Sequence, residues 1–267
     1  MTVLENDIAP MTPAASVIAR GVLAGAPTIW HVAEEIPVAI MLNSEPLAVM
    51  MATPHELDDF AIGFALAEGF LASARAVRGV LTLPADGGVT VDVSADEAAV
   101  LPRAAPLRGV EGRSGCGLCG VAEIGAVMRP LPSIATQFTP ATSAVRRAFR
   151  ALPGHQPMNR VNRSVHAAAW CDADGAILLA REDVGRHSAL DKLIGALARE
   201  DRSFEEGFVT LSSRLSFELV QKAATVGIRA MAAISAPTAL ALAVAAEAGV
   251  VLAIACGDNV MLFGPKG

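Results

Sequence analysis

The sequence is poor in cysteine, with four among 267 residues. Cys116 and Cys119 are too close to join distant parts of a fold, and Cys171 and Cys256 stand alone. This usage excludes a disulfide framework and is typical of a reducing compartment. A chain of this length can bury a hydrophobic core without crosslinks. We therefore expect a cytoplasmic protein.

The sequence also lacks a long apolar run and an excess of basic residues. Its longest stretch without a charged residue, 230–246, is 17 residues long and contains Pro237. A membrane-spanning helix needs about 20 apolar residues, so we expect no membrane segment. Glu5 and Asp7 lie where a secretory signal would be basic, so no signal peptide is expected. The net charge of -6 argues against non-specific nucleic-acid binding.

The N-terminal part has the pattern of a small α+β domain. Alternating apolar residues predict strands in 36–51 and in 77–93, each range folded at a turn into a hairpin. Between them, Thr53 and Glu56 have the spacing of a capping box at the start of a helix. We predict a flexible tail over residues 1–26 and the small domain over 27–112.

The remaining part, 113–267, has the pattern of an α/β domain. Its predicted strands alternate with helices of 10 or more residues, which favours βαβ units and a largely parallel sheet. The expected strands lie at 165–170, 177–180, 208–211, 229–234 and 250–255, and the expected helices near 142–152, 187–200, 216–226 and after 235.

The strongest chemical pattern is GCGLCG at residues 115–120. The glycines leave both thiols uncrowded and let backbone N–H groups turn toward the sulfur. A thiol at a helix start is more acidic, and its thiolate can accept sulfur from a persulfide donor. Cys119 could stabilise, relay or resolve that species. Half of a zinc site is the alternative, but it lacks a second matched pair of ligands.

Two further patterns carry charge. Residues 181–187 (REDVGRH), with Asp191 and Lys192, group ionisable side chains at a strand-to-helix turn, where α/β sheets usually bind ligands. A helix N-terminus beside Arg186 would suit a phosphate, although a solvated turn is equally compatible. Five arginines without an intervening acid suggest either an anion patch or a solvated face; they are Arg146, Arg147, Arg150, Arg160 and Arg163.

Three separated strings together resemble one family. GCGLCG at 115–120, EDVGRHSALDK at 182–192 and SAPTAL at 235–240 have the order and spacing of the FdhD family of formate dehydrogenase accessory sulfurtransferases. The resemblance extends over roughly residues 30–263. It implies a cytidine deaminase-like three-layer α/β domain with a smaller α+β domain, and a homodimer.

The resemblance also implies a function. Cys116 would accept sulfur as a persulfide from a cysteine desulfurase, with Cys119 as the second catalytic cysteine. The sulfur would pass to the molybdenum cofactor, bound as bis-molybdopterin guanine dinucleotide, for use by formate dehydrogenase. No metal of the protein's own is expected. The expected cofactor contacts are Arg186 and His187 together with Ile254, Ala255, Cys256, Gly257, Asp258 and Asn259.

Two other functions are open. A zinc-dependent deaminase would need a glutamate beside its histidine ligand and a proline before its cysteine pair. The chain instead has His166-Ala167-Ala168, and Gly115 precedes Cys116. A non-catalytic cofactor-binding chaperone is favoured by a departure from the family, since residues 254–256 replace an aromatic-x-Arg and so lack a phosphate-holding charge.

Overall fold

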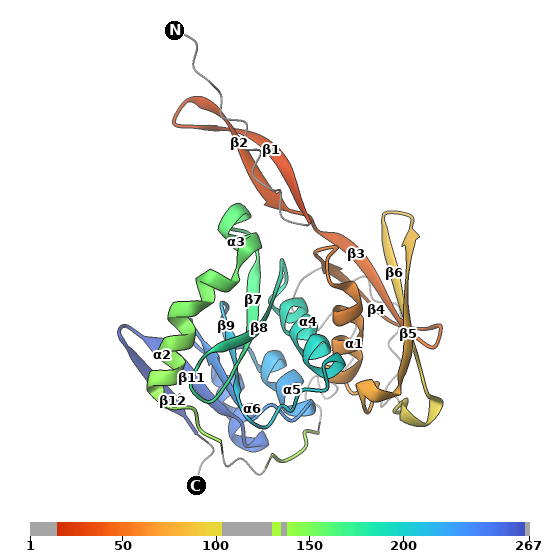
Figure 1. Cartoon of the computed structure of the whole chain (residues 1–267), viewed down its shortest axis with the longest axis vertical. Coiled ribbons are helices and arrows are strands. Elements are labelled where there is room, and N and C mark those ends of the chain that lie inside the picture. Colours follow the sequence, from red (N-terminus) through yellow and green to blue (C-terminus); the bar gives the residue numbers. More distant parts are fainter. Residues whose placement is uncertain (1–14, 103–129, 135–137, 265–267) are drawn as a thin grey trace.

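The computed structural model describes residues 15–102, 130–134 and 138–264. Their strands form a two-stranded, a four-stranded and a six-stranded sheet (Figure 1). The GCGLCG string with Cys116 and Cys119 lies outside the described residues.

The four-stranded sheet has the order β4-β3-β6-β5. Both hairpins predicted in this part are confirmed, since β3 pairs antiparallel with β4 and β5 with β6. The two hairpins join through the parallel pair β3–β6. Their strands are β3 (Ile36–Leu42), β4 (Glu45–Ala52), β5 (Val77–Ala85) and β6 (Gly88–Ala95). The short helices η1 (Ala74–Ala76) and η2 (Glu97–Ala99) flank β5 and β6.

The predicted capping box at Thr53 and Glu56 is wrong. Helix α1 (Leu57–Ala67) begins one residue after Glu56, which takes a left-handed conformation at φ 54° and caps nothing with its side chain. Thr53 is fully buried, and its hydroxyl group bonds to Asp183 and Lys192 instead. The Thr53 hydroxyl group, which the capping-box spacing placed at the helix end, therefore bonds instead to a buried ion pair that is distant in the sequence.

The six-stranded sheet has the order β12-β11-β10-β9-β7-β8. Its strands are β7 (His166–Cys171), β8 (Ile177–Asp183), β9 (Phe208–Leu211), β10 (Ala230–Ala233), β11 (Val251–Cys256) and β12 (Asn259–Phe263). Helices α4 (Arg186–Arg199), α5 (Phe217–Thr225) and α6 (Ala239–Ala248) connect β8, β9, β10 and β11 in turn. These elements agree with the predicted alternation.

The sheet is mixed rather than largely parallel. β9, β10 and β11 are parallel neighbours, but β7 lies antiparallel between β8 and β9, and β12 is antiparallel to β11. β8 and β9 therefore point the same way without touching. The sequence shows alternation of elements, but it does not show that the β7–β8 hairpin inserts β7 into the sheet.

Helices cover both faces of this sheet. Helix α2 (Thr142–Ala151) packs Ala144, Val145 and Ala148 on one face, followed by η4 (Leu152–His155) and α3 (Pro157–Asn162). On the other face lie α4, α5 and α6 (Figure 1). Helix α1 lies between α4 and the four-stranded sheet, and one hydrophobic core joins these layers. The core contains Val38, Phe60, Leu193 and Leu252, each fully buried.

Helices α1 and α4 cross at two glycines. A Cβ atom on Gly63 would lie 1.8 Å from the backbone oxygen of Asp191, and one on Gly195 would lie 1.9 Å from that of Asp59. Only glycine permits this backbone approach. The small sheet is thereby held directly against the helices of the large sheet.

The N-terminal hairpin was not predicted. Ser16–Leu23, expected to be part of a flexible tail, forms β1, which pairs antiparallel with β2 (Ala26–Ala33). Ala24 and Gly25 both have positive φ in the turn, as a two-residue hairpin loop requires. The boundary predicted between residues 26 and 27 thus falls at the start of β2. The boundary predicted at 112 lies outside the described residues and stays a prediction.

Among the residues that the structure describes, no helix has the length and hydropathy to span a bilayer.

Candidate functional site

One edge of the six-stranded sheet collects the residues that the sequence singled out. Strands β8, β9, β10 and β11 all end there, and α4, α5 and α6 each begin there. The strand register places five residues level in one row across the sheet, namely Arg181, Ala168, Leu211, Ala233 and Ile254. Three helix N-termini at one edge favour a negatively charged ligand, because their N–H groups and dipoles point toward it.

Arg186 and His187 lie at the β8 end of this edge. Arg186 is the first residue of α4 and is half-buried, whereas His187 is only 1% exposed. Within the described residues, Nε of Arg186 is buried without a hydrogen-bond partner. His166, at the start of β7, pairs in register with Asp183. Burial and then the charge of Arg186 lower the pKa of His166, against the opposite effect of Asp183.

The second group of expected cofactor contacts lies farther along the same edge. Ile254 and Ala255 are half-buried at the end of β11, and Cys256 pairs with Asn259 across the exposed turn of the β11–β12 hairpin. Gly257 supplies a positive φ of 58° in that turn. Four strand spacings separate β11 from β8, which is about 19 Å at the usual spacing. The two groups therefore share an edge but cannot contact one small group together.

The charged residues at the end of β8 and in the first turns of α4 mostly contact other residues of the protein. Asp183 and Lys192 are fully buried, with Nζ of Lys192 2.7 Å from Oδ2 of Asp183. Thr53 completes the cluster, since its hydroxyl group donates to Asp183 at 2.7 Å and accepts from Lys192 at 2.8 Å. Its backbone N–H and that of Gly185 also donate to Asp183. This cluster fixes the strand-to-helix turn that presents Arg186. The capping-box spacing assigned Thr53 to a helix cap and so missed its place in this cluster.

Asp191 belongs to a second buried cluster. Nζ of Lys222 lies 2.8 and 2.9 Å from the two carboxylate oxygens of Asp191 and 2.8 Å from Oε1 of Glu68. Two carboxylates thus share one ammonium group. Burial raises the pKa of Asp191 to about 7 against the influence of Lys222. The cluster ties α1, α4 and α5 together.

Glu182 also has a structural role. Its carboxylate accepts the backbone N–H groups of Met158 at 2.7 Å and Asn159 at 2.9 Å, at the start of α3. Burial raises the pKa of Glu182 while these hydrogen bonds lower it. The residue therefore anchors α3 beside the edge of the sheet.

The five predicted anion-patch arginines are all exposed but divide between two helices. Arg146, Arg147 and Arg150 line an open hollow of about 490 Å³ on α2, whereas Arg160 belongs to α3 and Arg163 follows it. Nη1 of Arg147 donates to the backbone oxygen of Asp174 at 3.5 Å. Three of the five arginines thus share one hollow, and the other two belong to the next helix and its end.

The two described cysteines differ in their suitability for sulfur chemistry. Cys171 is fully buried, and burial raises the pKa of its thiol to about 12. Its Sγ lies 3.4 Å from the hydroxyl group of Thr210. Cys256 is exposed at the edge. Cys171 is therefore a packing residue, and Cys116 and Cys119 remain the predicted reactive pair.

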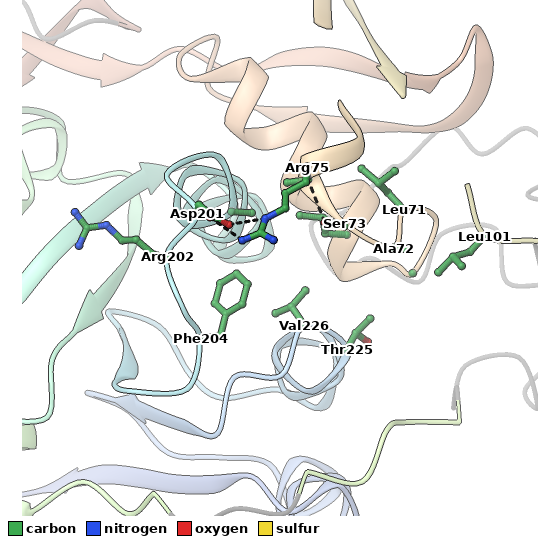
Figure 2. Close-up of a pocket in the computed structure, with 14 residues that line it drawn as sticks. Leu71, Ala72, Ser73, Arg75, Leu101, Asp201, Arg202, Phe204, Thr225 and Val226 are labelled. Carbon is green, nitrogen blue, oxygen red and sulfur yellow. Dashed lines mark hydrogen bonds and ion pairs between the residues drawn. The ribbon is translucent and has the colours of Figure 1, made fainter. Parts of the chain in front are cut away.

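A separate pocket of about 310 Å³ lies at the opposite ends of the helices. Leu66, Ala198 and Thr225 line it near the C-termini of α1, α4 and α5. Figure 2 shows Arg75 and Asp201 facing each other at this pocket, joined by hydrogen bonds of 2.9 and 2.8 Å. The pocket is distinct from the sheet edge. Among the described residues, no group of three His, Cys, Asp or Glu side chains is arranged to hold a metal ion.

The structure is that of a mixed α/β protein in which Arg186 and the N-termini of α4, α5 and α6 lie at one edge of the six-stranded sheet. A model of the FdhD/NarQ family matches residues 33–263, so the chain belongs to that family. A curated relative named "Sulfur carrier protein FdhD", from Bordetella petrii, is 45% identical over 234 residues, which cover 87% of this chain and 84% of the relative. A relative of the same name from Variovorax paradoxus is 46% identical over 233 residues, with the same coverage.

A solved structure shares the fold. The crystal structure of a putative formate dehydrogenase accessory protein from Desulfotalea psychrophila superposes with a TM-score of 0.75. It covers 94% of this chain and 97% of its own length at 24% sequence identity.

Proposed function

We propose that this chain is a sulfur carrier that serves formate dehydrogenase. Cys116 accepts sulfur from a cysteine desulfurase, and the molybdenum cofactor, as bis-molybdopterin guanine dinucleotide, is the substrate that receives it. The observation that carries the proposal is the GCGLCG string in a chain about 45% identical to proteins named sulfur carriers. Cys171 is a poor candidate for the sulfur-accepting cysteine, because burial raises the pKa of its thiol to about 12. We also propose a cytoplasmic homodimer with the cytidine deaminase-like layering.

Each proposed sulfur-transfer step is an exchange in which a thiolate attacks a sulfur–sulfur bond and a second thiolate or hydrosulfide leaves. The Cys116 thiolate attacks the outer sulfur of the donor persulfide, forming the Cys116 persulfide and releasing the donor thiolate. If the Cys119 thiolate then attacks the inner sulfur, the outer sulfur leaves as hydrosulfide and a Cys116–Cys119 disulfide forms. The same persulfide is the shared intermediate whether Cys119 resolves it or only stabilises it.

The edge of the six-stranded sheet supports cofactor binding. Arg186 and the N-termini of α4, α5 and α6 supply positive potential for phosphate groups, and His187 lies beside Arg186. The β11–β12 turn, residues 256–259, closes the other end of the edge. A cofactor carrying two guanine dinucleotide arms is long enough to use both ends.

Mass spectrometry tests sulfur loading. After incubation with a cysteine desulfurase and cysteine, we expect the protein to gain the mass of one sulfur atom in a form that reducing agents remove. Cys116→Ala should lose the adduct, whereas Cys256→Ala, the matched exposed cysteine, should retain it. An adduct that persists in Cys116→Ala would contradict the proposal. Full formate dehydrogenase maturation by Cys116→Ala would favour the non-catalytic chaperone.

Titration with guanosine diphosphate tests the cofactor edge, because this probe carries a guanosine and a pyrophosphate. Arg186→Gln should weaken its binding about tenfold, the effect of losing one charged hydrogen bond. Arg78→Gln, which changes an exposed arginine on β5, should leave binding unchanged. Equal binding by both variants would exclude Arg186 from the site.

A further inference from the structure

The β1–β2 hairpin projects from the body of the protein (Figure 1). Its base is fixed beside α3, where Nε1 of Trp30 donates to the backbone oxygen of Asn162 at 3.3 Å. Beyond Trp30, every residue of 20–29 is exposed except Thr28, which is half-buried. The outer part of the hairpin is therefore an arm that is held at its base and open along its length.

The tip of this arm, residues 22–27, carries no polar side chain. Its sequence is VLAGAP. Directly paired residues of an antiparallel ladder share a face, so Val22 lies with Pro27 on one face and Leu23 lies with Ala26 on the other. Val22 is 73% exposed and Leu23 is 65% exposed. An ordinary surface hairpin turns one polar face to water, whereas both faces of this tip are apolar.

The polarity of the arm changes with distance from its turn. Arg20 pairs with Ile29 in the fourth pair from the turn, which lies about 10 Å from the first pair at the usual rise per residue. Arg20 is the one charged residue of 16–33 when His31 is neutral, and this range contains no acidic residue. Elements that dock at a bilayer surface bury their apolar part about 5–10 Å deep, and basic residues above it contact anionic headgroups. The length of the apolar tip and the position of Arg20 match that profile.

We propose that the tip of the β1–β2 hairpin docks on an anionic phospholipid membrane. Lipid surrounds an inserted tip on all sides and so covers both of its faces, whereas a single protein surface would cover one face. Protein interfaces also carry about one hydrogen bond per 100–200 Å², and no side chain of 22–27 has a group that could form one. Arg20 supplies the positive charge that anionic headgroups attract.

The proposed contact is shallow and reversible. Both strands of a two-stranded hairpin have unpaired backbone N–H and C=O groups along one edge, and burying such groups in hydrocarbon is costly. The tip therefore stays at the boundary between headgroups and acyl chains. Its two large apolar side chains, Val22 and Leu23, bury less apolar surface than one myristoyl chain, which by itself binds a membrane only marginally. The chain would thus exchange between the membrane and solution.

Membrane docking is independent of the proposed sulfur chemistry. The tip lies wholly before residues 33–263, the part that the family model matches. Vesicle binding and sulfur loading are also measured separately. Failure of one proposal therefore leaves the other standing.

Co-sedimentation of the full chain with phospholipid vesicles tests the proposal. We expect binding to phosphatidylcholine vesicles that contain about one quarter phosphatidylglycerol, and about fivefold weaker binding to phosphatidylcholine alone, since one basic residue near an anionic surface contributes about that factor. Arg20→Gln should remove this difference. Val22→Ser/Leu23→Ser should weaken binding to the anionic vesicles at least about tenfold, because two apolar side chains no longer leave water.

The matched control for the tip variant is Leu81→Ser/Leu83→Ser on β5. These positions are 55% and 48% exposed, and this variant should bind vesicles as the unchanged chain does. Urea unfolding shows whether each variant is folded. The proposal would be overturned by a full chain that stays in solution with anionic vesicles, by a tip variant that binds as tightly as the unchanged chain, or by equal binding of the unchanged chain to both kinds of vesicle.

Tryptophan quenching locates the tip directly. The chain has two tryptophans, Trp30 at the base of the arm and Trp170 in the core. Leu23→Trp adds an indole at the tip, and lipids brominated on their acyl chains should quench this variant much more than the unchanged chain. A Leu23→Trp protein that such vesicles do not quench would contradict insertion. Emission that shifts to shorter wavelength as protein concentration rises without vesicles would show that a second copy covers the tip, and this result would also overturn the proposal.

Discussion

Lys192 allows a direct test of whether the charged residues of 181–192 stabilise the fold. Its side chain is fully buried, and Nζ contacts Asp183 at 2.7 Å and the Thr53 hydroxyl group at 2.8 Å. Replacement by methionine keeps most of the side-chain volume but removes the ammonium group. We expect Lys192→Met to lower the free energy of unfolding by about 3 kcal/mol, because Asp183 becomes a buried charge without a counter-ion.

The hydrogen bonds that Asp183 keeps determine how much unfolding free energy Lys192→Met loses. Breaking a buried pair from one side typically costs about 3–5 kcal/mol. Asp183 would keep three donors, which are the backbone N–H and hydroxyl group of Thr53 and the N–H of Gly185. These hydrogen bonds continue to compensate part of its charge, so we expect the lower end of the range.

Urea unfolding followed by circular dichroism measures the loss at neutral pH. Asp183→Asn added to Lys192→Met should recover about 1–2 kcal/mol, since the uncompensated charge is removed. Arg75→Met provides a control in which an exposed ion pair with Asp201 is broken, and we expect no measurable change. A Lys192→Met protein within about 1 kcal/mol of the unchanged chain would refute the structural role, because a buried pair broken from one side costs more. If that stable variant also failed to transfer sulfur, the lysine would instead belong to the site.

Three further predictions concern packing, titration and thiol reactivity. Gly63→Ala should lower the free energy of unfolding by about 3 kcal/mol or more because its Cβ would collide with α4, whereas Gly79→Ala, with open space around it, should stay within about 0.5 kcal/mol. His166 has a lowered pKa in the fold, so its contribution to stability is present above the unfolded-state pKa and is lost as pH falls through the folded value. The fall in unfolding free energy between pH 8 and pH 5.5 should therefore be smaller in His166→Asn. Iodoacetamide at pH 8 should alkylate Cys256 in the native protein and leave Cys171 unmodified, as peptide mass mapping can show.

Each of these three predictions would be contradicted by a specific result. Equal unfolding midpoints for the two glycine variants would mean that α1 and α4 do not cross closely. An unchanged pH dependence in His166→Asn would show that this histidine titrates as in the unfolded chain. Rapid native-state alkylation of Cys171 would be incompatible with a thiol buried between β7 and α2.

Much of the fold was predictable because it depends on local patterns. Alternating apolar residues placed the β3–β4 and β5–β6 hairpins, and Phe208–Leu211 was predicted with its observed bounds. The β1–β2 hairpin had a readable signal in Ala24-Gly25, a two-residue turn between apolar runs. Strand β12 follows a similar turn at Gly257. The β1–β2 turn lacks the asparagine or aspartate that marks the predicted hairpins, whereas the turn before β12 contains Asp258 and was missed all the same.

By itself, the sequence indicated the family and the alternation of strands and helices from β7 to β11, and it predicted Cys116 and Cys119 as the reactive pair. These features depend on strings and periodicities that a few consecutive residues specify. Only the tertiary structure decided that Thr53 joins Asp183 and Lys192, that β7 separates β8 from β9, and that Arg186 and Ile254 share one edge about 19 Å apart. The contacts among these elements join residues as far apart as Thr53 and Lys192, 139 positions along the chain, and the free energy of burying charges and packing layers selects them. No local spacing encodes that selection.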